Sequence, residues 1–279
     1  MRMLSMAAMA ALLMIQGCAA PTLHDAPACT STVPNARYTG PYKGTENRLS
    51  AADMARDLHC ATLFKTEKYP RGFVAIYGSS RLGEDKEGAP ASDNGQLYQG
   101  IRLFAREWTN VYGDKLPILT GAGPGIMEAG SRGAVEAGGP SIGYTTYYGP
   151  ARDKGGDARL AFQTYRGQAI VSDGLIFSSV AMRESMMVLH SAAVVIAPGG
   201  TGTEWETFQI IESIKSQQLD PVPVYLVGKR DIYWKGFEQR LQEMARLGTI
   251  RAAEVSTLIE FVEDPAQLSE LLAKRLQMR

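Results

Sequence analysis

Three glycine-rich turns follow apolar, strand-like segments and have the composition of a ligand-binding backbone. They read Gly78-Ser79-Ser80, Gly121–Gly125 and Pro198–Thr203. Because they lack bulky side chains, their backbone N–H groups can approach a ligand closely. The second and third turns also open a predicted helix, whose N-terminus carries unsatisfied N–H groups and a partial positive charge. The turn residues that we expect to contact a ligand are Ser79, Gly121, Gly123, Gly199, Gly200, Thr201, Gly202 and Thr203.

The ligand predicted for these turns is a monophosphate. The dinucleotide fingerprint GxGxxG does not fit, since the middle turn reads Gly-Ala-Gly-Pro-Gly, and no GxxxxGK[ST] phosphate loop occurs. Phosphate binding at helix N-termini without a triphosphate motif favours a single phosphate group. The alternative is a set of tight strand-to-helix turns without a ligand, which three such turns in one chain disfavour.

Glu206 lies three residues after Thr203, and this spacing permits two roles. Thr-x-x-Glu is a capping box, in which the Glu side chain bonds the backbone amide of the N-cap residue. A carboxylate fixed beside a ligand can instead stabilise positive charge, form a covalent bond or orient water. Glu204 lies on another side of the same predicted helix, where we expect it to cap the helix or to be solvated.

Strands and helices alternate from Gly72 onward, which predicts a parallel sheet covered by helices on both faces. Ligands bind such sheets at the carboxyl ends of the strands, where the three turns lie. We therefore predict one doubly wound, Rossmann-like α/β domain over 49–279, with an irregular pocket wall or lid over 145–175. The predicted strands are 73–77, 117–120, 141–144, 192–197 and 223–227. The predicted helices are 49–65, 96–112, 126–137, 178–190, 204–217, 234–247 and 265–277.

The first residues have the layout of a secretory signal, with Arg2 before an apolar run from Met3 to Ile15. The run ends in Ile-Gln-Gly-Cys18, which resembles the lipobox of bacterial lipoproteins, where the cysteine is acylated. We expect 1–17 to be the signal peptide, Cys18 the lipidation site and 18–48 a flexible tether. Because residue 19 is not Asp, the expected location is the outer membrane, facing the periplasm. The alternative is a cleaved signal with an incidental Cys18.

Composition restricts the partners. The 29 basic and 29 acidic side chains balance, which argues against nucleic-acid binding, and the lipid is the only membrane attachment expected. Cys29 and Cys60 would meet an oxidising periplasm, where they could form a disulfide or remain two unrelated thiols. No Cys/His spacing indicates a metal site.

Four segments resemble the Lonely Guy family, whose members were long labelled lysine decarboxylases. They are VAIYGSSRLG, TGAGPGIMEAGSRGA, AMRESMM and PGGTGTEWE, and the resemblance covers about 72–275. PGGxGTxxE is intact from Pro198 to Glu206, whereas Ala122 replaces a family glycine. The resemblance implies a nucleoside 5′-monophosphate phosphoribohydrolase that needs no metal or organic cofactor. It also implies a homodimer with the helices around Arg183 and after Thr203 near its interface, which light scattering tests.

The resemblance assigns roles to single residues. Glu206 would face the ribose, and Arg183 would hold the phosphate or the departing base. Met182 would line the base pocket, although a Met at helical spacing more often packs in the core. Glu184 stands where the family has lysine, and this reversal of charge puts turnover or substrate preference in question.

The alternative functions follow from these departures. A nucleotide- or phosphate-binding lipoprotein of the same fold could keep the phosphate turns without turnover. A pyridoxal-phosphate decarboxylase is disfavoured, because no lysine is expected at a glycine-lined strand end where a Schiff base could form.

Overall fold

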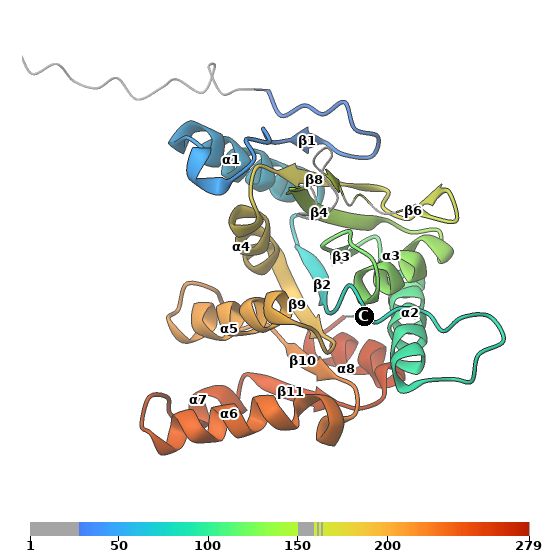
Figure 1. The fold of residues 1–279 in the computed structure, drawn as a ribbon, viewed down its shortest axis with the longest axis vertical. Coiled ribbons are helices and arrows are strands. Elements are labelled where there is room, and N and C mark those ends of the chain that lie inside the picture. The colour runs from blue at the N-terminus through green and yellow to red at the C-terminus, as the bar shows by residue number, and fades with distance from the viewer. Residues whose placement is uncertain (1–27, 150–158, 161, 163, 279) are drawn as a thin grey trace, which may run out of the picture.

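A computed structural model describes residues 28–278 apart from 150–158, 161 and 163 (Figure 1). The predicted signal peptide, Cys18 and the first part of the tether lie outside the described residues. The parallel strands, in chain order, are β1 (Tyr38–Thr39), β2 (Phe73–Tyr77), β3 (Ile118–Thr120), β4 (Ser141–Tyr148), β8 (Asp173–Phe177), β9 (Ser191–Ile196), β10 (Val224–Val227) and β11 (Ile259–Val262).

These strands form one sheet in the order β1-β8-β4-β3-β2-β9-β10-β11. All neighbouring pairs along this order are parallel. The central strands are apolar and fully buried, as expected when helices cover both faces of a parallel sheet. The remaining short strands are β5 (Arg159–Leu160), which pairs antiparallel to β4, and the β6 (Thr164–Tyr165) and β7 (Gln168–Ala169) hairpin.

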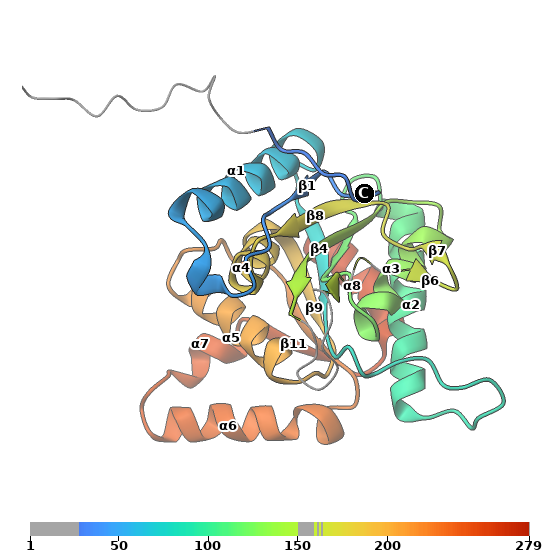
Figure 2. The ribbon, with the colours of Figure 1, turned by 45° about the horizontal axis from the view of Figure 1, so that its top comes forward.

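The helices divide between the two faces of the sheet (Figures 1 and 2). One core contains side chains from α1, α4, α5 and α6, and the other contains side chains from α2, α3 and α8. Successive side chains of β2 alternate between the two cores. Phe73, Ala75 and Tyr77 enter the first core, while Val74 and Ile76 enter the second. The helices are α1 (Ala51–Lys68), α2 (Asp93–Tyr112), α3 (Ile126–Glu136), α4 (Val180–His190), α5 (Thr201–Lys215), α6 (Lys235–Arg246), α7 (Ala252–Ser256) and α8 (Leu268–Arg275).

This arrangement confirms the predicted doubly wound α/β fold, but β11 was not among the predicted strands and three further details differ. The region predicted to be irregular contains β8, and β4 extends to Tyr148 rather than ending at Tyr144. The tether predicted over 18–48 is wrong for residues 28–48, because β1 joins the sheet beside β8 and Tyr38 is buried.

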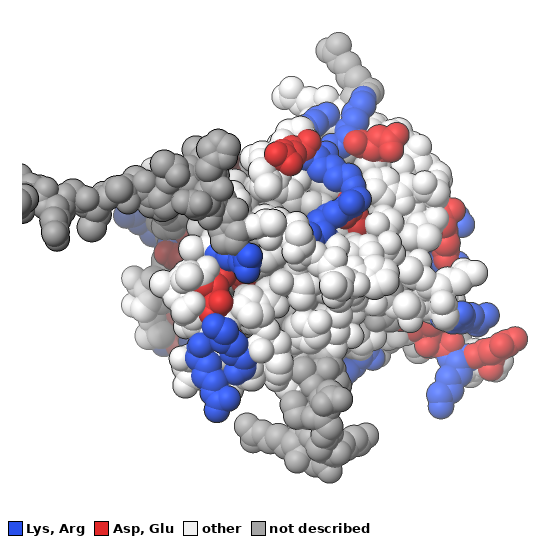
Figure 3. All heavy atoms as spheres, turned by 90° about the horizontal axis from the view of Figure 1, so that it is seen from above, with Lys and Arg blue, Asp and Glu red and all other residues white. Residues whose placement is uncertain are grey.

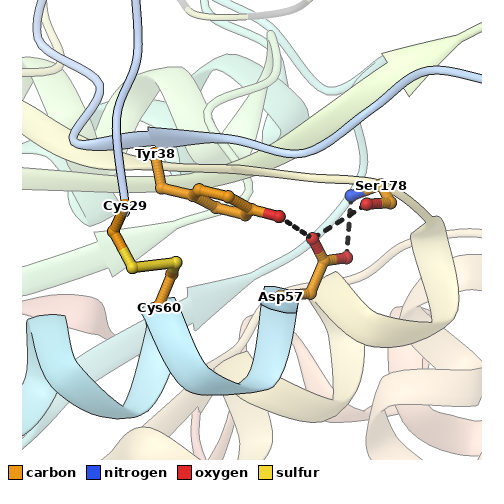
Figure 4. The surroundings of a disulfide bond; sticks show 5 residues. All are labelled: Cys29, Tyr38, Asp57, Cys60 and Ser178. Carbon is orange, nitrogen blue, oxygen red and sulfur yellow. Dashed lines mark hydrogen bonds between the residues drawn. A yellow bond between two sulfur atoms is a disulfide. The ribbon is translucent and has the colours of Figure 1, made fainter. Parts of the chain in front are cut away.

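The N-terminal segment is fastened to the domain at two places (Figure 4). Cys29 and Cys60 form a disulfide, which decides between the two alternatives left open by the sequence. Beside it, the Tyr38 hydroxyl donates to Asp57 Oδ1 over 2.8 Å. The amide and hydroxyl of Ser178 donate to the same carboxylate over 2.8 and 2.9 Å. Asp57 of α1 thus ties β1 to the residues that immediately precede α4.

None of the helices in the described part of the chain combines the length and the hydropathy needed to cross a bilayer. Figure 3 views the α1 and β1 end of the molecule. On that face, lysine and arginine side chains lie in small groups, some beside acidic side chains, among uncharged residues.

Candidate functional site

The three glycine-rich turns meet at one edge of the sheet. Their strands β3, β2 and β9 are neighbours, so their carboxyl ends lie side by side. The Ser79 amide donates to the carbonyl of Pro198 over 3.0 Å, and the Ile126 amide donates to the carbonyl of Ser79 over 3.1 Å. The first turn is therefore hydrogen-bonded to the third turn and to the first residue of α3, which directly follows the second turn.

Close approach explains a glycine in the second turn. Gly125 has a φ of +71°, and a Cβ at this position would lie 2.4 Å from the Ser79 carbonyl oxygen. An L side chain would be strained there on both counts. Ala122, at the position of a family glycine, also has a positive φ, of +52°.

Arg183 is on α4, on the face of the sheet that carries the first core, and is only 7% exposed. Its helix α4 begins at Ser179, whose side chain accepts a hydrogen bond from the Met182 amide. The guanidinium contacts Glu206 Oε1 over 3.2 Å and Glu184 Oε1 over 2.5 Å. Burial opposes its charge, but the Glu184 carboxylate and further groups raise the pKa of Arg183 above its ordinary value.

Glu206 points at this guanidinium and does not cap its helix. The N-cap of α5 is Gly200, which has no side-chain cap bond, so the capping alternative is wrong. The residue is 7% exposed. Burial and a hydrogen bond with Glu184 raise the pKa of Glu206 well above its ordinary range, although Arg183 acts in the opposite direction. Glu204 is exposed on the other side of α5.

The third turn presents its backbone to solvent. Gly199, Gly200, Thr201 and Gly202 are exposed, whereas Thr203 is buried beneath Gly199. The N-terminus of α5 is therefore exposed and has no side-chain cap. It lies at the same end of the sheet as Arg183, and this arrangement suits a phosphate. In the second turn, Gly121 and Gly123 are buried, and a Cβ on Gly121 would lie 3.2 Å from Arg183 Nη1.

Ser79 and Met182, both predicted to bind the ligand, contact other residues of the chain. The Ser79 hydroxyl accepts a hydrogen bond from the Arg81 amide, within its own turn. Met182 is half-buried against the first core.

In the single chain, Ile210 and Ile211 of α5 are buried and Phe208 is half-buried, whereas Trp205 is 43% exposed. The homodimer stays a prediction.

Sequence reasoning missed two tyrosines at the cluster formed by Arg183, Glu184 and Glu206. Tyr148, at the end of β4, accepts a hydrogen bond from Arg183 Nη2 over 3.4 Å. Tyr77, at the end of β2, is buried, and burial followed by the charges of Glu206 and Glu184 raises the pKa of its phenol. The aromatic and threonine-rich run from Ser141 to Tyr148 was the signal that could have placed Tyr148 on a strand.

One lysine lies just after the carboxyl end of a strand. Lys229 follows Gly228 after β10, so its amine has to be considered for a Schiff base. Its amine lies 2.6 Å from Asp93, and this contact raises the pKa of Lys229. A Schiff base needs a neutral amine, which this pairing opposes.

Two hollows on the described surface lie away from the three turns, along α2. Their volumes are about 430 and 310 Å³. Near the turns themselves, Arg183 and Glu184 of α4 and Glu206 of α5 are buried, and both carboxyls contact the guanidinium. Among the described residues, no three His, Cys, Asp or Glu side chains are placed to hold a metal ion.

Comparison with known proteins identifies one family. The family model described as "Possible lysine decarboxylase" matches residues 127–272, just over half of the chain. No curated protein matches the sequence.

Three solved structures illustrate what the chain is similar to. The molybdenum cofactor carrier protein of Chlamydomonas reinhardtii is 19% identical, with 74% of this chain and 98% of that chain covered and a TM-score of 0.47. The molybdenum cofactor binding protein of Rippkaea orientalis is 22% identical, with 74% and 97% covered and a TM-score of 0.43. DNA processing protein A of Streptococcus pneumoniae is 15% identical, with 80% and 82% covered and a TM-score of 0.42.

Proposed function

Because this chain belongs to the family described as possible lysine decarboxylases, which includes the Lonely Guy proteins, we propose that it hydrolyses nucleoside 5′-monophosphates. The products are a free base and ribose 5-phosphate. The observation that carries the proposal is the buried pair of Arg183 and Glu206 at the meeting point of the three turns.

The chemistry of the bond explains why this pair suits it. Cleavage of an N-glycosidic bond builds positive charge on the anomeric carbon and the ring oxygen. A fixed carboxylate such as Glu206 can stabilise that charge in a site from which water is largely excluded. Arg183 and the exposed backbone of the third turn supply partners for the phosphate or for the departing base.

The test is the release of base from AMP, GMP, CMP and UMP by the purified protein. Glu206→Gln keeps the shape of the side chain and removes the carboxyl group that would face the ribosyl cation as a carboxylate, so we expect the rate to fall by ~10²–10³. The variant should remain folded and still bind nucleotide. Glu204→Gln, on the exposed side of the same helix, is the matched control and should keep the wild-type rate.

Near wild-type hydrolysis by Glu206→Gln would overturn the catalytic assignment. Release of no base from any of the four nucleotides by the wild type would overturn the enzymatic proposal itself.

A second candidate is a nucleotide-binding protein without turnover. The observation that favours it is the engagement of Arg183 by two carboxyl groups, which compete with an anionic ligand for the guanidinium. Calorimetric binding of a nucleoside monophosphate without release of base would decide for this candidate. Decarboxylation through pyridoxal phosphate has no comparable support, since Lys229 is exposed and paired with Asp93.

A further inference from the structure

Glu184 and Glu206 form a carboxyl pair inside the candidate site. Glu184 is 2% exposed and Glu206 is 7% exposed, and both carboxyls contact the guanidinium of Arg183, over 2.5 and 3.2 Å. Glu184 Oε2 is buried and has no hydrogen-bond partner among the described residues. The two groups come from neighbouring helices, α4 and α5, so the contact depends on the fold and not on local sequence.

Two buried carboxyls that share one guanidinium repel each other where water is scarce, which favours protonation of one of them at neutral pH. The pair therefore shares one proton. Arg183 is farther from Glu206 (3.2 Å) than from Glu184 (2.5 Å), so its positive charge favours an ionised Glu206 less strongly than the closer contact would. The proton then resides mainly on Glu206, in agreement with the raised pKa of that residue.

Other titratable groups at the cluster are phenols. Tyr77 from β2 is buried beside both carboxyls, and Tyr148 from β4 contacts Arg183. Phenols are neutral at pH 7, so the charges that act on Glu206 come from Arg183 and Glu184. A lysine at position 184, as in the family motif, would favour ionised Glu206, whereas the glutamate of this chain does the opposite.

We propose that Glu184 keeps a proton on Glu206, and that Glu206 gives this proton to the departing base as the glycosidic bond breaks. The inference rests on the proposed function and assigns Glu184 as a positioning residue, which acts through Glu206.

The step balances in atoms and charge. As the C1′–N bond breaks, its electron pair leaves with the base nitrogen, which takes the proton from Glu206. The Glu206 carboxylate that remains faces the ribosyl cation. Water then adds to C1′ and returns one proton to the carboxyl pair, which restores the resting state.

The first test is the pH dependence of base release by the wild type, Glu184→Gln and Glu206→Gln. Without the Glu184 carboxyl, Arg183 pairs with Glu206 alone and favours its ionised form, so Glu184→Gln should be ~10²-fold slower or worse at pH 7. Its rate should recover as the pH is lowered, because Glu206 regains its proton. The substrate phosphate titrates identically for every variant and cancels in the comparison. Glu206→Gln should be slow at every pH.

The second test changes the leaving group. 4-Nitrophenyl riboside 5-phosphate releases a nitrophenolate that needs no proton. Glu184→Gln should cleave it within about tenfold of the wild-type rate at pH 7, whereas Glu206→Gln should lose this activity too. Parallel losses on both substrates, without recovery at lower pH, would show that Glu184 is merely structural and would overturn the proposal.

A third measurement separates this inference from the proposed function and requires no turnover. The infrared spectrum of the wild type at pH 7 should contain a neutral carboxyl band that disappears in both variants. If the band is present but no base is released from any nucleotide, the proposed hydrolysis and the proton transfer to the base are refuted. The shared proton would still be supported. Absence of the band would overturn the shared proton itself.

Discussion

His190 is the last residue of α4, and its ring is buried rather than exposed at the helix end. The Tyr144 hydroxyl lies 3.0 Å from its Nδ1 atom. Burial, assisted by the positive charge of Lys65, lowers the pKa of His190 from 6.5 to about 4. The folded protein therefore holds a neutral imidazole across a pH range in which the unfolded chain takes up a proton.

This difference predicts a loss of stability in mild acid. The contribution of neutral His190 is complete above pH 6.5 and is lost as the pH falls from 6.5 to about 4, up to about 3 kcal/mol. His190→Gln removes the titrating group, so its unfolding free energy should fall less steeply than that of the wild type between pH 7 and 4.5. Denaturant unfolding at a series of pH values measures both slopes, and equal slopes would contradict the assignment.

At the residue scale, the sequence identified most of the cluster but not its contacts. Glu206 and Arg183 were predicted from the family motifs, and the choice between cap and ligand-facing carboxylate needed the position of the helix start. α5 begins at Thr201, which places the N-cap at Gly200 and removes the Thr203 capping box. The contact of Glu184 with Glu206 joins residues of two helices, and no periodicity within either helix encodes it.

The N-terminal segment is the element whose role was mistaken. A run rich in Pro, Gly, Thr and Asn without periodicity is typical of a linker, and β1 is too short to produce an alternating pattern. Its place is determined by partners distant in sequence, which are β8, the disulfide and Asp57. β8 was missed because its five residues are surrounded by short strands and turns, whereas β2 and β9, the well-predicted strands, end at recognisable glycine turns.

The disulfide should contribute strongly to the stability of this element. It closes a loop with a sequence separation of 31, for which the chain-entropy model gives about 4 kcal/mol. Cys29→Ala, Cys60→Ala and the double variant should each lose a similar amount, because each removes the same bond. Chemical denaturation measures the loss, and the reduced wild type controls for the changed side chains. Oxidised wild type and variants with equal unfolding midpoints would contradict this prediction.

At the scale of the whole molecule, the layered architecture was predictable because it follows from alternation of strands and helices. The strongly apolar strands required cover on both faces, and α1, α4 and α5 lie opposite α2, α3 and α8, as that reasoning expects. The edges of the sheet were less predictable, since β1 and β11 are held by packing and carry a weak local signal.

We propose that the whole domain is held at a membrane through a lipid on Cys18. The proposal rests on the apolar leader and the Gln-Gly-Cys sequence that ends it. Cys18→Ser should leave the precursor unprocessed or move the protein from the membrane fraction to the soluble periplasmic fraction. Fractionation with immunoblotting checks this, and a variant that is processed and retained like the wild type would refute the anchor.

The disulfide also limits how far an anchored domain could travel. Cys29 lies only 11 positions after Cys18, and the chain beyond Cys29 belongs to the domain. A fully extended segment of that length reaches about 40 Å, little more than the diameter of a small domain. A tether that ran to residue 48 would have reached roughly 100 Å. With the shorter tether, an anchored domain would encounter its substrate only in the thin layer of solvent beside the lipid surface. Diffusion along the membrane would then determine where the protein works.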